Sequence, residues 1–119
     1  MNWYLIKIVF RIICGDGHHT AQFDEQLRII FAENKIAALE KGHALGKQEG
    51  EVFLNNKQQP VQWKFINVTE IYKLGVLMDG AELYSCIKET DDVISYMDMV
   101  NHKANSILHS NTHELLQLV

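Results

Sequence analysis

One apolar segment near the N-terminus carries the clearest structural signal: WYLIKIVFRIICGDG, residues 3–17. Its even positions are uniformly apolar up to residue 14, whereas Lys7 and Arg11 interrupt the odd ones. A period of two is typical of a strand with one face in the core and the other partly covered. The Gly-Asp-Gly that follows tolerates positive φ, so we expect a turn there and a long hairpin.

The returning strand, residues 22–31, is amphipathic. Residues at alternating positions separate into two rows, which is the pattern of a strand with two different faces. The apolar row holds Phe23, Leu27, Ile29 and Phe31, and the polar row holds Gln22, Asp24, Gln26 and Arg28.

A helical period replaces the strand period from Asn34, which is a suitable N-cap, and extends to Val52 and Phe53. Small residues recur every four positions inside it. Each interior glycine costs a helix roughly 1 kcal/mol relative to alanine, so the row needs a reason. Close packing of the helix on the sheet and a helix contact between subunits are the two explanations, and the last glycine alternatively marks the helix end. The row consists of Ala38, Gly42, Gly46 and Gly50.

A long strand is predicted over residues 61–74, after a polar loop that closes at Pro60. Its apolar side changes near Asn67, which indicates a β-bulge or a strand covered on both faces. Asp79-Gly80 is a turn signal before a fourth strand over residues 83–87. A second helix begins at Thr90-Asp91-Asp92, where an N-cap precedes an apolar stripe. That stripe consists of Val93, Met97, Val100, Ala104 and Ile107.

These elements predict an α+β fold in the order ββαββα, with a four-stranded, mainly antiparallel sheet and two helices packed on it. We expect one domain over residues 1–110. Residues 111–119 form a C-terminal tail, in which Asn111 and Glu114 have the capping-box spacing of a short helix.

The composition excludes several classes of protein. The chain has 119 residues, 22% of them charged, and a net charge of −4. Such an acidic balance disfavours nucleic acids and anionic membranes as partners. Lys7 and Arg11 interrupt the first apolar stretch, so it does not resemble a signal peptide. Only two cysteines, Cys14 and Cys86, are present, which favours a reducing cytoplasm, and we expect both to be buried as small apolar side chains.

The residue types that carry chemistry do not form a recognisable motif. His18 and His19 lie beside Asp16 in the predicted turn, and no distant metal ligand is specified. On the second helix and beyond it, His102, His109 and His113 have helical spacing but lack the HExxH pattern. Ser85, Cys86 and Cys14 have no nucleophile signature around them. We therefore expect no metal and no cofactor, and no catalytic residue can be named.

Aromatic residues on the predicted strands are the best candidates for a binding surface. Trp3, Trp63, Phe65, Tyr72 and Tyr84 are accompanied by a few charged side chains, and such walls form either a core or a ligand groove. The candidate surface consists of Glu25, Trp63, Lys64, Glu70 and Tyr72.

Several segments together resemble a family of small bacterial proteins, the domain-of-unknown-function family 4288. They are the opening Asn2-Trp3-Tyr4, the run Phe23-Asp24-Glu25-Gln26, the helix that ends in Gly46-Lys47, and residues 61–68, 71–74 and 79–85. Residues 61–68 carry the distinctive pattern Val-x-Trp-x-Phe-x-x-Val. The resemblance implies no activity and no functional residue, and it does not extend past His109.

Three interpretations of the function stay open. The first is a non-enzymatic binding or protein-interaction module of the bacterial cytoplasm, whose partner is a second copy (a homo-oligomer) or another protein. The second is a small enzyme or ligand-binding domain with an aromatic-walled pocket, in which Glu25, Glu70 or a histidine is the acid-base group. The third is nucleic-acid binding through a patch of basic residues, Lys7, Arg11, Lys64 and Lys73. The absence of a catalytic motif favours the first.

Overall fold

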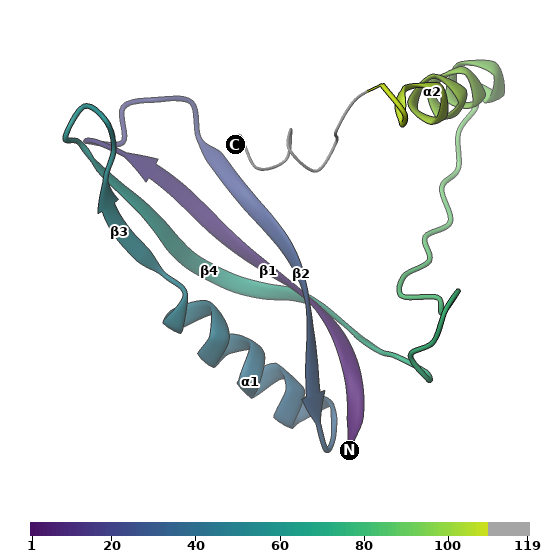
Figure 1. The fold of residues 1–119 in the computed structure, drawn as a ribbon, viewed down its shortest axis with the longest axis horizontal. Helices are drawn as coiled ribbons and strands as arrows, with labels where there is room; N and C mark the ends of the chain where they lie inside the picture. Colours follow the sequence, from purple (N-terminus) through teal and green to yellow (C-terminus); the bar gives the residue numbers. More distant parts are fainter. Residues whose placement is uncertain (110–119) are drawn as a thin grey trace. The chain divides into compact units, whose positions relative to one another are not determined.

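The computed structural model describes residues 1–109, apart from the side chain of Glu51. The chain divides into two compact units, Met1–Tyr84 and a second that begins at Ser85, and each is described by itself. The first unit contains five elements (Figure 1): β1 (Asn2–Cys14), β2 (Gln22–Ala32), α1 (Lys35–Gln48), β3 (Glu51–Leu54) and β4 (Pro60–Lys73). The second unit contains α2 (Val93–Ser106). The ββαββα order and the α+β class are therefore confirmed.

The four strands form one antiparallel sheet in the order β2-β1-β4-β3. The hairpin of β1 and β2 is regular, with Asn2 opposite Ala32 and Ile12 opposite Gln22. The pairing of β1 with β4 shifts twice, between Lys7 and Ile8 and between Val9 and Phe10. Each shift inserts one extra residue into β4, which is a β-bulge. The bulge predicted near Asn67 is thus confirmed, and a second one follows it.

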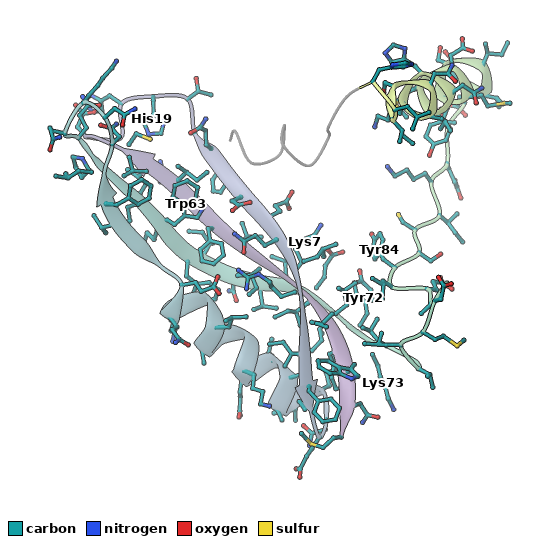
Figure 2. All side chains as sticks on the ribbon, in the orientation of Figure 1. Lys7, His19, Trp63, Tyr72, Lys73 and Tyr84 are labelled. Atoms are coloured by element: carbon teal, nitrogen blue, oxygen red, sulfur yellow. The ribbon has the colours of Figure 1, made fainter. Side chains whose placement is uncertain are left out.

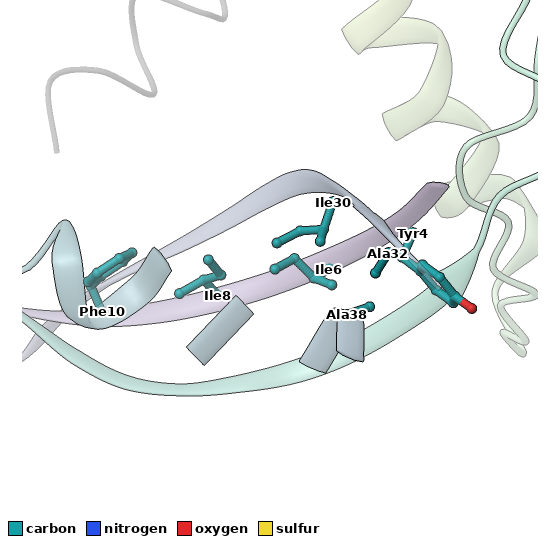
Figure 3. Packing of buried hydrophobic residues seen from close by; sticks show 7 residues of the cluster. All are labelled: Tyr4, Ile6, Ile8, Phe10, Ile30, Ala32 and Ala38. Carbon is teal, nitrogen blue, oxygen red and sulfur yellow. The ribbon is translucent and has the colours of Figure 1, made fainter. Parts of the chain in front are cut away.

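The helix α1 packs on one face of this sheet, where the core forms (Figure 3). Even-numbered residues of β1 point to this face because successive side chains of a strand alternate. Around them pack partly buried side chains of α1 and β4, including Leu45, Phe65 and Val68. The buried cluster consists of Tyr4, Ile6, Ile8, Phe10, Ile30, Ala32 and Ala38.

The predicted row of small residues lets α1 approach the sheet. Asn34 caps the helix by accepting a hydrogen bond from the Ala37 N–H at 2.8 Å, as predicted. Ala38, Gly42 and Gly46 are buried on the sheet side. A Cβ at Gly46 would lie only 2.3 Å from the Phe65 ring. The row therefore serves packing within the chain, and the alternative of a helix contact between subunits is wrong for these residues.

The fourth strand was predicted in the wrong place. Residues 83–87 form no strand, whereas Val52 and Phe53, which were assigned to the helix, belong to β3. The helix ends at Gln48, before Gly50, and the chain then pairs with the start of β4. The Asn55 side chain closes this hairpin by accepting hydrogen bonds from the backbone N–H groups of Lys57 and Gln59.

The second unit is built around α2, which begins where the sequence predicts. Asp92 is its N-cap and accepts hydrogen bonds from the Ser95 N–H at 3.0 Å and the Ser95 hydroxyl at 2.7 Å. These bonds stabilise the charged carboxylate and lower the pKa of Asp92. Neither of the helices in the described part of the chain combines the length and the hydrophobicity that a membrane span requires. The predicted tail, 111–119, and His113 lie outside the described residues.

Candidate functional site

Three side chains form a hydrogen-bonded cluster on the sheet face opposite α1, which we call the open face (Figure 2). Lys7 of β1 lies opposite Glu70 of β4, and its Nζ is 2.9 Å from Glu70 Oε2. The Tyr72 hydroxyl donates to Glu70 Oε1 at 2.8 Å. The Tyr84 ring packs edge-on against that of Tyr72, with centroids 5.5 Å apart. Glu70 and Tyr72, both sequence candidates, are thus brought together.

The cluster shifts the pKa of each of its members. The hydrogen bond to Glu70 raises the pKa of Lys7, and the hydrogen bonds from Lys7 and Tyr72 lower that of Glu70. The hydrogen bond to the Glu70 carboxylate raises the pKa of Tyr72 to about 12. Each shift favours the protonation state that prevails at neutral pH. Glu70 is therefore a weak base and Tyr72 a weak acid, opposite to what acid-base catalysis needs.

The space beside this cluster is small. A hollow of about 70 Å³ is lined by Lys7, Leu27, Glu70 and Tyr84. Ligand pockets of proteins typically hold roughly 300–1,000 Å³. The cluster fastens the segment that follows β4 to the sheet and offers no room for a substrate.

Replacing Glu70 by Gln is expected to return the pKa of Tyr72 from about 12 toward its ordinary value of 10.0, since the charged acceptor is lost. The measurement is the ultraviolet absorbance of tyrosinate against pH, with Tyr72→Phe identifying the Tyr72 contribution. Glu25→Gln is the matched control, because Glu25 is exposed and is not among the causes of the Tyr72 shift. An unchanged Tyr72 titration in Glu70→Gln would contradict this assignment.

The same shifts set how stability depends on pH. Glu70, with a lowered pKa, stabilises the fold above its ordinary value of 4.5, and this contribution is lost as the pH falls through the lowered pKa. Tyr72, with a raised pKa, stabilises the fold below pH 10.0, and this contribution is lost as the pH rises through about 12. Tyr72→Phe should flatten the alkaline loss, which urea unfolding at several pH values would measure.

Two further sequence candidates lie on the open face but apart from each other. Glu25 pairs with Val9, and its charge helps to raise the pKa of Lys7. Lys64 lies opposite Arg11, so two exposed cations face each other across the strands. Lys73 pairs with Tyr4 and belongs to the helix side. The four basic residues of the nucleic-acid interpretation are therefore divided between the two faces.

Trp63 lies on the other side of the sheet, the helix side, apart from the remaining candidates. Its indole Nε1 donates to Asp24 Oδ2 at 3.1 Å, and its ring stacks on Phe53 with centroids 5.9 Å apart. Together with Gln26 and Glu49 these two rings line an open hollow of about 430 Å³. Trp63 is half-buried, so its ring lies neither fully inside the core nor freely exposed on the wall of a groove.

The sequence did not indicate the polar chain beside this hollow. Arg28 forms an ion pair with Glu49 and donates to Gln26 Oε1, and Gln26 in turn donates to Asp24. Alternation of Asp24, Gln26 and Arg28 in β2 was the available signal, since it places all three on one face. Glu49 could not be foreseen, because it lies 21 positions away from Arg28.

The histidines of the first hairpin form no metal site. His19 Nε2 accepts from the Cys14 N–H at 3.0 Å while Nδ1 lies 2.8 Å from the Thr20 carbonyl oxygen, so Nδ1 carries the proton. His18 Nδ1 is 3.5 Å from Asp16 Oδ2. Within residues 1–109 no group of three or more His, Cys, Asp or Glu side chains could hold a metal ion.

The two cysteines are both free thiols. Cys14 is half-buried and Cys86 is exposed, so the expected burial of Cys86 is wrong. The segment that carries Cys86 forms no strand, and its thiol therefore has no sheet face to pack on.

Comparison with known proteins identifies the family. The sequence profile described as Domain of unknown function (DUF4288) matches residues 3–85. The search of curated proteins and the search of solved structures found no match. The matched range covers the sheet except for Asn2, together with α1 and the segment that carries Tyr84, and it amounts to more than half of the chain. The chain therefore belongs to the DUF4288 family.

Proposed function

We propose that this chain is a non-enzymatic protein-interaction module that self-associates through the open face of its sheet. One observation carries the proposal: β2 turns its apolar row toward the open face and its polar row toward the helix side. Phe23, Leu27, Ile29 and Phe31 are 52%, 54%, 49% and 40% exposed. On the other side, Asp24, Gln26 and Arg28 are half-buried. If the open face were only a solvated surface, the polar row would be expected to lie on it and the apolar row on the helix side.

This apolar row continues onto the neighbouring strand. Trp3 of β1 packs against Phe31, with ring centroids 4.7 Å apart, and remains 36% exposed. Contiguous apolar surface of this kind is a mark of protein interaction sites. No other described segment pairs with the outer edge of β2, and an unpaired edge invites another chain.

The proposal includes a cytoplasmic location in a bacterial cell. Two free thiols, one of them exposed, support a reducing compartment. The enzyme alternative has less support, because Glu25 is exposed and Glu70 is held in its charged form by Lys7 and Tyr72.

Light scattering over a range of concentrations tests the proposal. The wild-type chain is expected to give a molar mass above 13.7 kDa, approaching a multiple of it as the concentration rises. Leu27→Gln combined with Ile29→Gln should return the mass to that of a monomer, since the change removes apolar area from the open face. The control is Ile36→Gln, an exposed position on α1 that should leave association unchanged. A wild-type monomer at every concentration would refute self-association.

A further inference from the structure

We infer that two copies of this chain pair through their β2 edges, antiparallel and centred on Gln26, and so join two four-stranded sheets into one. This inference rests on the proposed function and specifies its partner, edge and register. Three observations carry it. Alternate backbone groups of β2 point outward, and the Phe31 carbonyl at that edge already accepts a hydrogen bond from Lys41. The strand also carries opposite charges at Asp24 and Arg28.

The direction of the backbone groups follows from hydrogen bonds at the end of β1. The Trp3 carbonyl accepts from the Leu74 N–H at 2.8 Å, so the polar groups of Trp3 point away from β2. Phe31, opposite Trp3, must then point its own N–H and C=O outward. The regular register of β1 with β2 extends this alternation along the strand. Outward N–H and C=O groups therefore belong to Phe23, Glu25, Leu27, Ile29 and Phe31.

One of these outward groups is already occupied. Lys41 of α1 donates from its Nζ to the Phe31 carbonyl oxygen at 2.5 Å. A bound lysine at a strand edge blocks pairing at that residue. When a twofold axis perpendicular to the sheet relates the two copies, each residue of β2 lies opposite a partner residue of the same sheet face. Registers centred on Leu27 or Arg28 would place Phe31 opposite a partner residue within β2, at Phe23 or Glu25.

The register centred on Gln26 is the longest that leaves Phe31 outside the paired region, because the position opposite Phe31 would be residue 21, which precedes β2. It pairs Gln22 with the partner's Ile30 at both ends. On the open face, Phe23 lies opposite the partner's Ile29. The apolar rows of the two copies then meet across the junction, with the exposed Glu25 of each copy opposite the partner's Leu27.

Charge favours the same register. The register centred on Gln26 sets Asp24 of each copy opposite the partner's Arg28, which gives two such pairs by symmetry. Gln26 lies opposite its own copy, between the two pairs. Opposite charges directly across a strand pair are stabilising, and like charges are destabilising. Both bonds that Asp24 accepts, from Trp63 and from Gln26, end on Oδ2. Arg28 already donates four bonds, two to Gln26 and two to Glu49. A guanidinium has five N–H donors and a carboxylate about four acceptor sites, so one N–H of Arg28 and the Oδ1 atom of Asp24 retain capacity.

Two charge-reversed variants test the register. Asp24→Arg places two arginines opposite the partner's arginines, and Arg28→Asp places two aspartates opposite aspartates. Each variant alone is expected to dissociate at least about tenfold more readily than wild type, since juxtaposed like charges oppose association. An equimolar mixture should recover the mass of a dimer, because both pairs are then complementary. Circular dichroism confirms that each variant is folded.

The outcomes separate this inference from the proposed function. A wild-type monomer refutes the proposed self-association and, with it, the register. A wild-type dimer whose charge variants still dimerise alone, or whose mixture fails to recover, refutes only the register.

A disulfide test covers the case in which a charge variant does not fold. The backbone N–H and C=O groups of Gln26 point toward β1, so Gln26 and its copy form a non-hydrogen-bonded pair. The Cα atoms of such pairs are about 4.5 Å apart, within the range of a disulfide. In a background of Cys14→Ser and Cys86→Ser, Gln26→Cys is expected to form a covalent dimer under mild oxidation. Leu27→Cys is the matched control: it faces the partner's Glu25 and should cross-link far more slowly. Equal cross-linking of both variants would overturn the register.

Discussion

Replacing Ile6 by Ala is expected to cost the first unit about 2–5 kcal/mol of its free energy of unfolding. The Ile6 side chain is completely buried, between β2 and β4 and beneath α1. Its Cδ1 would lie 2.9 Å from a Cβ at Gly42, so the helix already touches it and can move little closer. The cavity would therefore stay open. Because a small domain is stable by only about 5–15 kcal/mol, a large part of the fold's stability would be lost.

Urea unfolding followed by tryptophan fluorescence measures this effect. Both tryptophans, Trp3 and Trp63, lie in the first unit, so their signal reports on that unit alone. Ile36→Ala is the matched control, because Ile36 is 70% exposed on α1 and its truncation should change stability by less than about 0.5 kcal/mol. Equal losses for the two isoleucines would contradict the location of the core.

The buried face of β1 was predictable from the sequence alone. Its even positions from Tyr4 to Cys14 are all apolar, and a period of two leaves only one way to bury them together. In β4 the same reasoning identified a change of face near Asn67 but not its cause. Two bulges return Phe65, Val68 and Ile71 to one core, although their spacing fits no single period. Periodicity reveals that a strand is irregular, whereas the pairing partner decides how the irregularity is resolved.

The misplaced fourth strand has a local cause. Val52 and Phe53 continue the apolar period of the helix, so the pattern alone does not separate them from it. Gly50, whose Cβ would lie 3.3 Å from the Trp63 carbonyl oxygen, allows the chain to pass close to β4, and β3 begins at the next residue. Pairing with β4 then determines the strand, and such a distant contact leaves no periodic signal.

The candidate surface was predicted in part, for a similar reason. Glu70 and Tyr72 are two residues apart on one strand face, so their contact follows from local geometry. Their partner Lys7 lies on β1, and only the pairing of β1 with β4 brings it there. Trp63 lies on the opposite face from Glu70, because the two bulges between them cancel and the ordinary alternation of a strand then separates positions 63 and 70.

Replacing Gly46 by Ala is expected to destabilise the first unit, although alanine is the better helix former. In an open helix this change would gain about 1 kcal/mol. Here the new Cβ would lie 2.3 Å from Phe65 Cδ1 and 2.4 Å from Cε1. The Phe65 ring cannot move aside easily, since it contacts Phe10 and His43 edge-on, with centroids 6.2 and 5.8 Å away. Overpacking of this kind costs about 1–3 kcal/mol, and we expect that loss to exceed the gain.

A double-mutant cycle shows whether the ring is the cause. Phe65→Ala removes the ring atoms that the new Cβ would meet, so Gly46→Ala should cost less in that background than in wild type, with a coupling energy of about 1 kcal/mol or more. Gly42→Ala is the matched control on the same helix face, where the nearest atom is the end of the flexible Ile6 side chain at 2.9 Å. There the helix gain and the packing loss should nearly cancel. If Gly46→Ala instead stabilised the chain, the close approach of α1 to β4 at Phe65 would be disproved, and with it the reason for glycine at this position.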